Sequence, residues 1–189
     1  MQFRSRTRPS PNHPSMQFQG GIIHLPSPPP RSLVVIDVEN MIINGPDQAN
    51  DFDFQDAIAR VAGVADIQRT DHVFIGVGSN RPEAVFSCRT AWPTAAIRCL
   101  SGADGADRAL SQLIVDEAMV QRSYDRVVVA SGDHHFAEPV GELHRLGVHT
   151  VVLSWREKLS AQLRHAASEV RYITNYFGTQ PNEDKLVTC

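Results

Sequence analysis

The chain has 189 residues, of which 42% are hydrophobic and 21% charged, and these proportions are typical of a globular domain and exclude wholesale disorder. No run of about 18 apolar residues occurs, so no membrane-spanning helix is expected, and no apolar segment follows the N-terminal arginines, so no secretory signal is expected. The three cysteines are an odd number without a Cys-x-x-Cys spacing, which excludes a disulfide framework and a cysteine-type zinc site. We therefore expect a cytoplasmic protein.

The charge is distributed unevenly along the chain. The net charge is −3, but residues 1–31 contain four arginines and no acidic residue, so the remaining residues together carry −7. An acidic domain repels nucleic acid unless its carboxylates are gathered around bound cations. The positions of the acidic residues therefore decide which partners the domain can have.

Composition also divides the chain into three parts. Residues 1–31 hold seven of the twelve prolines and few apolar side chains, so we expect a disordered N-terminal tail that contains proline and arginine. Residues 32–175 form the expected domain, and residues 176–189 are expected to be a C-terminal tail.

Between the tails, short β-branched apolar runs alternate with segments of helical periodicity. In chain order, we expect a strand at 33–36, a helix at 54–64, a strand at 72–77, a helix at 81–88, a strand at 95–99, a helix at 104–122, a strand at 127–130, a helix at 136–146, a strand at 150–153, a helix at 158–167 and a strand at 170–173. This alternation predicts an α/β fold, a three-layer α/β/α sandwich with a mainly parallel central sheet and helices on both faces. In such sheets, ligands bind beyond the carboxyl ends of the strands, at a topological switch point.

Polar side chains follow these expected strands. Asp37 and Asn40 come after the first strand, Asp133 comes after the strand at 127–130, and Asp104 and Asp107 stand at the start of the longest helix. Carboxylates brought together repel one another unless a cation lies between them, and oxygen ligands suit Mg²⁺ or Mn²⁺. A metal ion would neutralise such a pocket and let a phosphodiester approach.

Each of these residues also has a purely structural interpretation. Asp37 could begin a turn, and Asn40 could be an ordinary cap residue. Asp104 could be an N-cap, with Asp107 three residues later in the manner of a capping box. The Ser-Gly-Asp segment at 131–133 could be a plain turn that opens the next helix.

Three motifs occur in a fixed order along the chain: Asp-x-x-Asn at 37–40, Gly-x-Asp-x-x-Leu at 105–110 and Ser-Gly-Asp-x-x-Phe at 131–136. A Leu-Ser-x-x-Leu-x-x-x-Ala segment follows at 159–167. Together they resemble the NYN domain, a branch of the PIN-like metal-dependent ribonucleases, over about residues 32–175. The resemblance implies a PIN-like, Rossmannoid fold.

The resemblance further implies a divalent-metal-dependent ribonuclease that hydrolyses the phosphodiester bonds of RNA, and Mg²⁺ or Mn²⁺ as the cofactor. The expected catalytic residues are Asp37, Asn40, Asp107 and Asp133. The three aspartates would hold the metal, Asn40 would hold a phosphate oxygen or a water of the metal, and Asp104 is a candidate outer-shell or second-metal ligand.

RNA also requires positive charge beyond the metal, and single-stranded RNA is the expected partner. The candidate substrate-binding residues lie at the same edge of the predicted sheet and are Ser131, Arg108, Arg156, Lys158 and Arg164. For these cations, a solvated surface is the alternative interpretation. Trp155 and Tyr176 are the candidate stacking aromatics, and for Trp155 the edge of the core is the favoured interpretation. A homo-oligomer is possible.

His135 occupies the position at which the NYN pattern has a second aspartate. An imidazole is neutral at pH 7 and is a softer ligand than a carboxylate, so as a metal ligand His135 would favour Mn²⁺ over Mg²⁺. The alternative is that His135 points away from the site and only caps the helix that follows.

Two other functions are compatible with the sequence. One is a non-catalytic RNA- or protein-binding module that kept the fold and lost the chemistry at His135. The other is a metal-dependent phosphatase or nucleotide hydrolase that uses the same acidic residues. Cleavage of single-stranded RNA, or release of phosphate from small phosphoesters, distinguishes these possibilities from one another.

Overall fold

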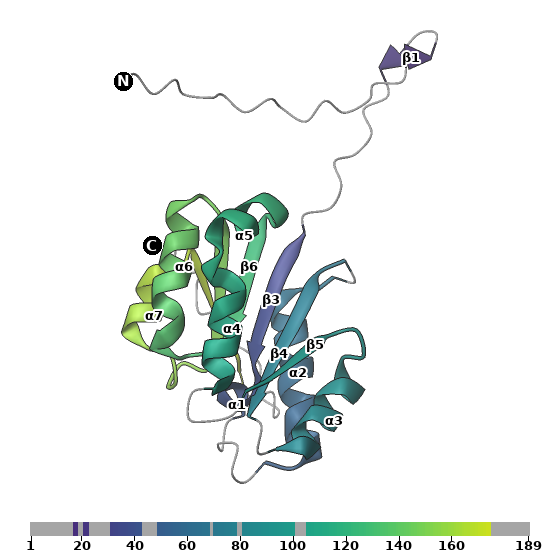
Figure 1. Ribbon diagram of the computed structural model, residues 1–189, viewed down its shortest axis with the longest axis vertical. Helices are drawn as coiled ribbons and strands as arrows, with labels where there is room; N and C mark the ends of the chain where they lie inside the picture. The colour runs from purple at the N-terminus through teal and green to yellow at the C-terminus, as the bar shows by residue number, and fades with distance from the viewer. Residues whose placement is uncertain are drawn as a thin grey trace.

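A computed structural model describes residues 17–18, 21–22, 31–42, 49–68, 70–78, 81–100 and 105–174, except for the side chains of residues 17, 18, 21, 22, 100, 105–109 and 117. Its centre is a parallel sheet of six strands in the order β5-β4-β3-β6-β7-β8, of which β5, β4, β3 and β6 are labelled in Figure 1. The strands are β3 (Ser32–Asp37), β4 (His72–Gly78), β5 (Ala96–Leu100), β6 (Arg126–Ala130), β7 (His149–Ser154) and β8 (Glu169–Tyr172).

The central strand β3 is apolar on both sides because helices cover both faces of the sheet. All six of its residues are buried. Val34 and Ile36 pack into one core, and Leu33 and Val35 pack into the other, as the alternation of side chains along a strand requires.

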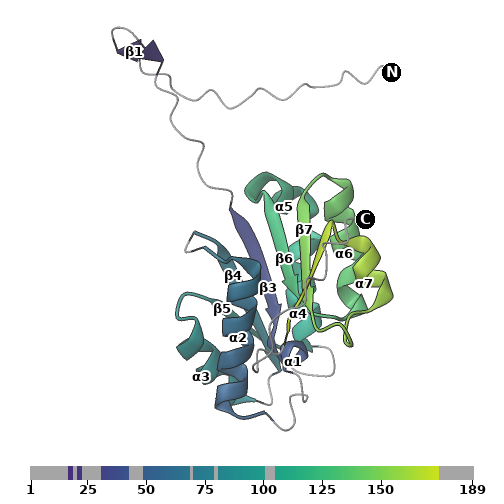
Figure 2. The same cartoon turned by 180° about the vertical axis from the view of Figure 1, so that it is seen from behind.

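One helical layer contains α2 (Asp51–Ala65), α3 (Pro82–Ala91) and the four-residue helix α1 (Val38–Met41), and Figure 2 shows α2 and α3 on this face. The other layer contains α4 (Gly105–Val115), α5 (Glu117–Ser123), α6 (Ala137–Arg145) and α7 (Ala161–Ala166). The three-layer α/β/α sandwich predicted from the sequence is therefore confirmed, and every strand pair of its central sheet is parallel.

The structure corrects the expected helix at 104–122, which is two helices. The break falls at Asp116, whose Oδ1 accepts a hydrogen bond of 3.0 Å from the backbone N–H of Met119 and so caps α5. Aspartate side chains compete in this way with the hydrogen bonds of a helix interior, which periodicity alone does not reveal. Similarly, the expected helix at 136–146 is preceded by a 3-10 turn, η2 (His134–Phe136).

The N-terminal segment contains two short described strands. β1 (Gln17–Phe18) and β2 (Gly21–Ile22) form an antiparallel pair inside the segment expected to be a tail. The expected C-terminal tail at 176–189 lies outside the described residues. Among the residues that the structure describes, no helix has the length and apolar character needed to cross a membrane.

The order of the strands creates a switch point between β3 and β6. From β3 the chain runs outward through β4 to β5, and from β6 it runs outward in the other direction through β7 to β8. The chain therefore turns toward one side of the sheet after β3 and toward the other side after β6. Sheets of this kind bind ligands at the point between two such strands. Asp37 ends β3, and residues 131–133 follow β6.

Candidate active site

Asp37 lies at the carboxyl end of β3 and is only 5% exposed. It is the N-cap of α1: its Oδ1 accepts a hydrogen bond of 3.3 Å from the backbone N–H of Asn40. Its Oδ2 accepts a hydrogen bond of 3.0 Å from the hydroxyl of Ser131. The cap interpretation and the site interpretation of Asp37 are thus compatible, since one carboxylate makes both contacts at the switch point.

Ser131 connects the two aspartates at the end of the sheet. Its hydroxyl, which donates to Asp37, also accepts a hydrogen bond of 3.1 Å from the backbone N–H of Asp133. Ser131 is fully buried, so this hydroxyl has little freedom to rotate toward another partner. The loop that carries Asp133 is therefore held against Asp37 by one side chain.

A second contact joins the same two loops. Oδ1 of Asn40 accepts a hydrogen bond of 3.0 Å from the backbone N–H of Gly132. Because the oxygen of the amide faces Gly132, its nitrogen faces away from Gly132. Gly132 leaves no room for a side chain, because a Cβ there would lie 2.2 Å from the carbonyl oxygen of Lys158 and 2.8 Å from the hydroxyl oxygen of Ser154. The glycine of the Ser-Gly-Asp motif thus permits a close approach of two backbones.

Asp133 is bracketed by two histidines. Its Oδ1 lies 3.1 Å from Nδ1 of His134 and 2.8 Å from Nδ1 of His135, and it also accepts the backbone N–H of His135 as the N-cap of η2. Potential ligand atoms of these three residues all lie within 4.8 Å of one another. Both imidazoles are more exposed than the carboxylate, with 61% and 44% of the His134 and His135 side chains accessible. The group therefore faces solvent at the end of β6.

Lys158 and Trp155, which follow β7, hold the end of α1. The ammonium of Lys158 donates to the carbonyl oxygens of Asn40 and Ile42, at 3.2 and 2.5 Å. The indole N–H of Trp155 donates to the carbonyl oxygen of Met41 at 2.8 Å. These are the carbonyls that a helix end leaves without partners. Burial lowers the pKa of Lys158, while the negative charge of Asp37 acts in the opposite direction.

Glu39 forms a third connection at this edge. Its Oε1 accepts a hydrogen bond of 3.0 Å from the backbone N–H of Gly78 at the end of β4, and Nε of Arg81 lies 3.7 Å from the same oxygen. An acidic side chain in a loop would ordinarily point into solvent. Here Glu39 ties α1 to the neighbouring strand instead.

The remaining predicted site residues are placed to different degrees. Asp107 and Arg108 belong to the first turn of α4, which follows β5 and so begins at the same edge of the sheet, and their side chains lie outside the description. Asp104 and Tyr176 lie outside the described residues altogether. Arg156 and Arg164 are exposed, and Trp155 is a buried core residue with 5% exposure.

Two features of the site escaped the sequence analysis. Tyr172, at the carboxyl end of β8, lies under the guanidinium of Arg156, and His134 joins His135 beside Asp133. The available signal for Tyr172 was its position as an aromatic residue at the end of the last expected strand. Its partnership with a residue 16 positions earlier depends on the pairing of β7 with β8.

Comparison with solved structures supports the fold. The protein of unknown function VPA0982 from Vibrio parahaemolyticus superposes with a TM-score of 0.57 at 16% sequence identity, covering 77% of this chain and 94% of that one. At this identity the similarity concerns the fold alone. No curated protein matches the chain.

A parallel three-layer α/β/α sandwich with two linked aspartates at its switch point defines a Rossmann-like protein with an acidic site. The model of the NYN domain matches residues 31–174, which include the whole sheet. The chain belongs to the NYN domain family, as its motifs suggested, and this family is nuclease-like and related to RNA.

Proposed function

We propose that the protein is a divalent-metal-dependent ribonuclease that hydrolyses phosphodiester bonds of RNA. The observation that carries this proposal is the link from Asp37 through the Ser131 hydroxyl to Asp133 at the switch point of the sheet. Two carboxylates on neighbouring strand ends, in an NYN domain, are suited to a cation and through it to a phosphate.

Among the described residues, the group whose ligand atoms lie within 4.8 Å of one another is Asp133, His134 and His135, so Asp37 enters the proposed ligand set through the chemistry of its carboxylate. Asp37 is a buried carboxylate that accepts hydrogen bonds from Asn40 and Ser131, and a cation would balance its negative charge further. Asp133 adds a second carboxylate, and His135 places an imidazole nitrogen 2.8 Å from it. Oxygen ligands suit Mg²⁺, and an additional imidazole suits Mn²⁺.

When bound, such an ion polarises a phosphate oxygen and acidifies a water molecule. The chain's own residues hold the geometry around it. Ser131 and Asn40 fix the loop of Asp133 relative to Asp37, and the Asn40 amide nitrogen would donate to a phosphate oxygen. Asp107 in the first turn of α4 is the proposed third ligand, with Asp104 as an outer-shell or second-metal ligand.

The substrate would be drawn by cations at the same edge. Arg156 and Arg164 are exposed and follow β7, and Arg108 lies next to Asp107 in α4. Lys158 is engaged with backbone carbonyls, so its contribution to RNA binding would be the positive potential rather than a direct contact. Ser131 is buried, so any effect on the substrate would pass through Asp37 and Asp133.

The test is cleavage of a labelled single-stranded RNA in EDTA, Mg²⁺ or Mn²⁺, with the wild type and with Asp37→Asn and Asp133→Asn. Cleavage should require metal and should fall by more than about 100-fold in both variants, because changing even an outer-shell partner of a metal ligand typically costs 10- to 100-fold. Asparagine keeps one of the two acceptor oxygens and removes a negative charge, so the free energy of unfolding should fall by no more than about 1–3 kcal/mol, the cost of one buried hydrogen-bond partner.

Asp116→Asn is the matched control, since Asp116 is also an N-cap aspartate but caps α5. It should leave cleavage unchanged. Phosphate release from small phosphoesters with intact RNA would replace the proposal by a phosphatase. RNA binding without cleavage in either metal would replace it by a binding module.

A further inference from the structure

Arg156 and Tyr172 form a cation–π pair, called the stacked pair below, at the carboxyl edge of the sheet. Cζ of Arg156 lies 4.5 Å from the centroid of the Tyr172 ring. Arg156 is exposed, and Tyr172 is half-buried as the last residue of β8. Tyr172 is paired in register with Ser154, the last residue of β7, so the pair stands on two adjacent strand ends.

The turn that carries Arg156 is fixed to the loop of Asp133. The carbonyl oxygen of Gly132 accepts a hydrogen bond of 2.9 Å from the backbone N–H of Ser160, and Gly132 packs closely against the carbonyl of Lys158. The turn is also anchored on both sides of Arg156: Trp155, which precedes it, is buried, and Lys158, two residues after it, donates to the end of α1. The stacked pair has a defined position relative to the acidic residues.

The distance from Asp37 to Tyr172 along the edge of the sheet is the length of a few nucleotides. Asp37 lies on β3 and Tyr172 on β8, which are three strand spacings apart in the sheet order. At about 4.8 Å per spacing, the two residues are roughly 14 Å apart along the edge. A strand of RNA held at the aspartates could therefore reach the stacked pair within a few nucleotides.

The chemistry of the pair is that of a base-stacking platform. A guanidinium that lies parallel to an aromatic ring presents its other face to a second planar group, and its N–H groups point outward in the same plane. Unpaired bases of RNA stack on aromatic rings and on guanidinium planes, whereas bases in a duplex are already stacked on one another. The positive charge also attracts the phosphate backbone, which the neighbouring carboxylates repel.

We propose that Arg156, stacked on Tyr172, binds an unpaired nucleobase of RNA and positions the strand across the aspartates. This inference rests on the proposed function for its substrate class. It assigns to the site a preference for single-stranded over double-stranded RNA, with the stacked base a few nucleotides from the phosphate at Asp37.

The test measures binding without cleavage. Fluorescence anisotropy in EDTA follows a labelled single-stranded RNA of mixed sequence, and a blunt duplex of the same length serves as competitor. Tyr172→Leu removes the ring and keeps apolar bulk, and Arg156→Lys keeps the charge and removes the plane. Each substitution should raise the Kd for single-stranded RNA by about 5-fold or more, because a base stacked on an aromatic ring contributes about 1–3 kcal/mol. The ratio of duplex Kd to single-strand Kd should fall as well.

Conservative and remote variants provide the controls. Tyr172→Phe keeps the ring and should bind single-stranded RNA as the wild type does. The melting temperatures of Tyr172→Phe and Tyr172→Leu show whether each variant is folded. Arg122→Gln removes an exposed arginine from the last turn of α5, which leads into the opposite end of β6, and should change binding less than 2-fold. In Arg156→Gln the slope of log K against log salt should fall by about 0.7, whereas Arg156→Lys should keep the slope.

The outcomes separate this inference from the proposed function. If Arg156→Lys and folded Tyr172→Leu bind single strands as the wild type does, stacking is overturned, and metal-dependent cleavage by the wild type would leave the ribonuclease proposal standing. If the wild type fails to bind single-stranded RNA, the proposed base-stacking role of Arg156 and Tyr172 is overturned. Weakened binding in both variants, together with metal-dependent cleavage that is impaired through KM, supports both.

Discussion

Gly132 is the residue at which the backbone of the site tolerates least change. Gly132→Ala places a Cβ 2.2 Å from a backbone oxygen, and neither the loop nor the turn at Lys158 can move without disturbing Ser131 or Asn40. We expect a loss of about 1–3 kcal/mol in the free energy of unfolding, the usual cost of overpacking, and a loss of RNA cleavage.

The matched substitution is Gly63→Ala in α2, where a Cβ would meet nothing within 4 Å. It should leave cleavage intact and raise the free energy of unfolding by about 0.5–1 kcal/mol, because alanine is the better helix former. Urea unfolding of both variants provides the comparison. Equal stability of the two alanine variants would contradict the close backbone approach at Gly132.

His135 decides the choice of metal at the site if it is a ligand. His135→Asp replaces a neutral nitrogen ligand by a carboxylate, which should raise the affinity for Mg²⁺ relative to Mn²⁺. The measurement is the ratio of Mn²⁺ to Mg²⁺ dissociation constants by calorimetry, together with the ratio of cleavage rates. We expect both ratios to shift toward Mg²⁺.

A structural role of His135 predicts a different outcome. Its backbone N–H already donates to Asp133, and a role limited to this cap survives the change of side chain. An unchanged metal ratio in His135→Asp would therefore remove His135 from the ligand set. His134→Asp provides the comparison for the second imidazole, which lies 3.1 Å from the same carboxylate oxygen.

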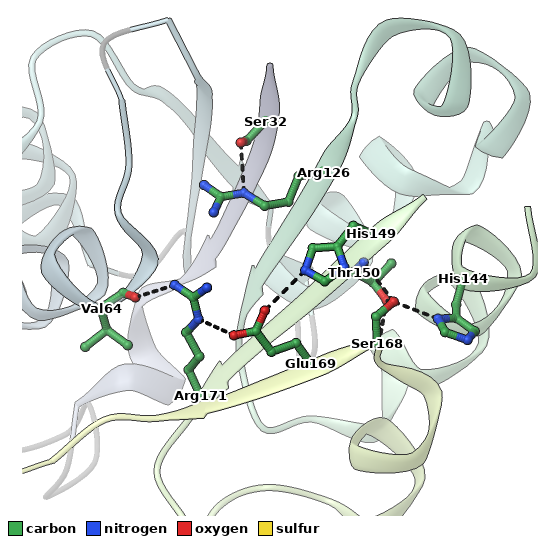
Figure 3. A network of polar contacts seen from close by, with 9 residues as sticks. All are labelled: Ser32, Val64, Arg126, His144, His149, Thr150, Ser168, Glu169 and Arg171. Atoms are coloured by element: carbon green, nitrogen blue, oxygen red, sulfur yellow. Dashed lines mark hydrogen bonds and ion pairs between the residues drawn. The ribbon is translucent and has the colours of Figure 1, made fainter. Parts of the chain in front are cut away.

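At the scale of elements, the edge strand β8 is attached to the domain by a polar network (Figure 3). Glu169 accepts a hydrogen bond of 2.6 Å from Nε of Arg171 and lies 3.2 Å from Nε2 of His149. Arg171 also donates to the carbonyl oxygen of Val64 in α2, at 2.9 Å. Nearby, the Ser168 hydroxyl lies 2.7 Å from Nδ1 of His144. The network joins β7, β8, α2 and α6.

This network predicts a pH dependence of stability. The hydrogen bond from Arg171 lowers the pKa of Glu169 below its ordinary value, burial acts in the opposite direction, and His149 lowers the pKa further. Since the folded state holds the lower pKa, the stabilisation is complete above the pKa of the unfolded glutamate, about 4.3, and is lost as the pH falls through the folded value.

Glu169→Gln removes this titration. Urea midpoints from pH 7 to pH 3 should fall less steeply for the variant than for the wild type, and the difference should develop below about pH 4.3. Glu138→Gln, at an exposed position in the first turn of α6, is the control and should follow the wild-type curve. Parallel curves for the wild type and Glu169→Gln would contradict the role of the network.

At the scale of the whole molecule, Arg31 is the point at which the described domain begins, and it is tied to the sheet. Its backbone N–H donates to the Asp125 carboxylate at 3.0 Å, and its carbonyl accepts the N–H of Asp125 at 3.0 Å. A protein that begins at Pro30 keeps both contacts. Its melting temperature should stay within a few degrees of the full chain, because residues 1–29 offer little apolar surface.

Differential scanning calorimetry of the two proteins measures this directly. A drop of about 10 °C or more would mean that the segment containing Gly21 and Ile22 packs on the domain, and the predicted boundary would then be wrong. The same pair of proteins, compared for RNA binding at two salt concentrations, reports whether the N-terminal arginines attract RNA.

The sequence by itself determined the fold class and the edge at which the site lies. Buried runs such as Val34–Ile36 and Val127–Val129 are too short for helices and are apolar on both faces, which specifies strands of a parallel sheet. Once the strands are parallel, residues that follow them meet at one edge, so Asp37 and Asp133 could be brought together by reasoning from order alone.

Only the tertiary structure decided which partner each side chain takes. The Ser131 hydroxyl bridges two aspartates, Lys158 binds the carbonyls of α1 rather than facing a phosphate, and Arg156 stacks on Tyr172. These contacts join residues on different strands and turns, and they depend on strand order and register. Local patterns in a sequence carry the period of an element and its caps, but not the neighbour that folding places beside it.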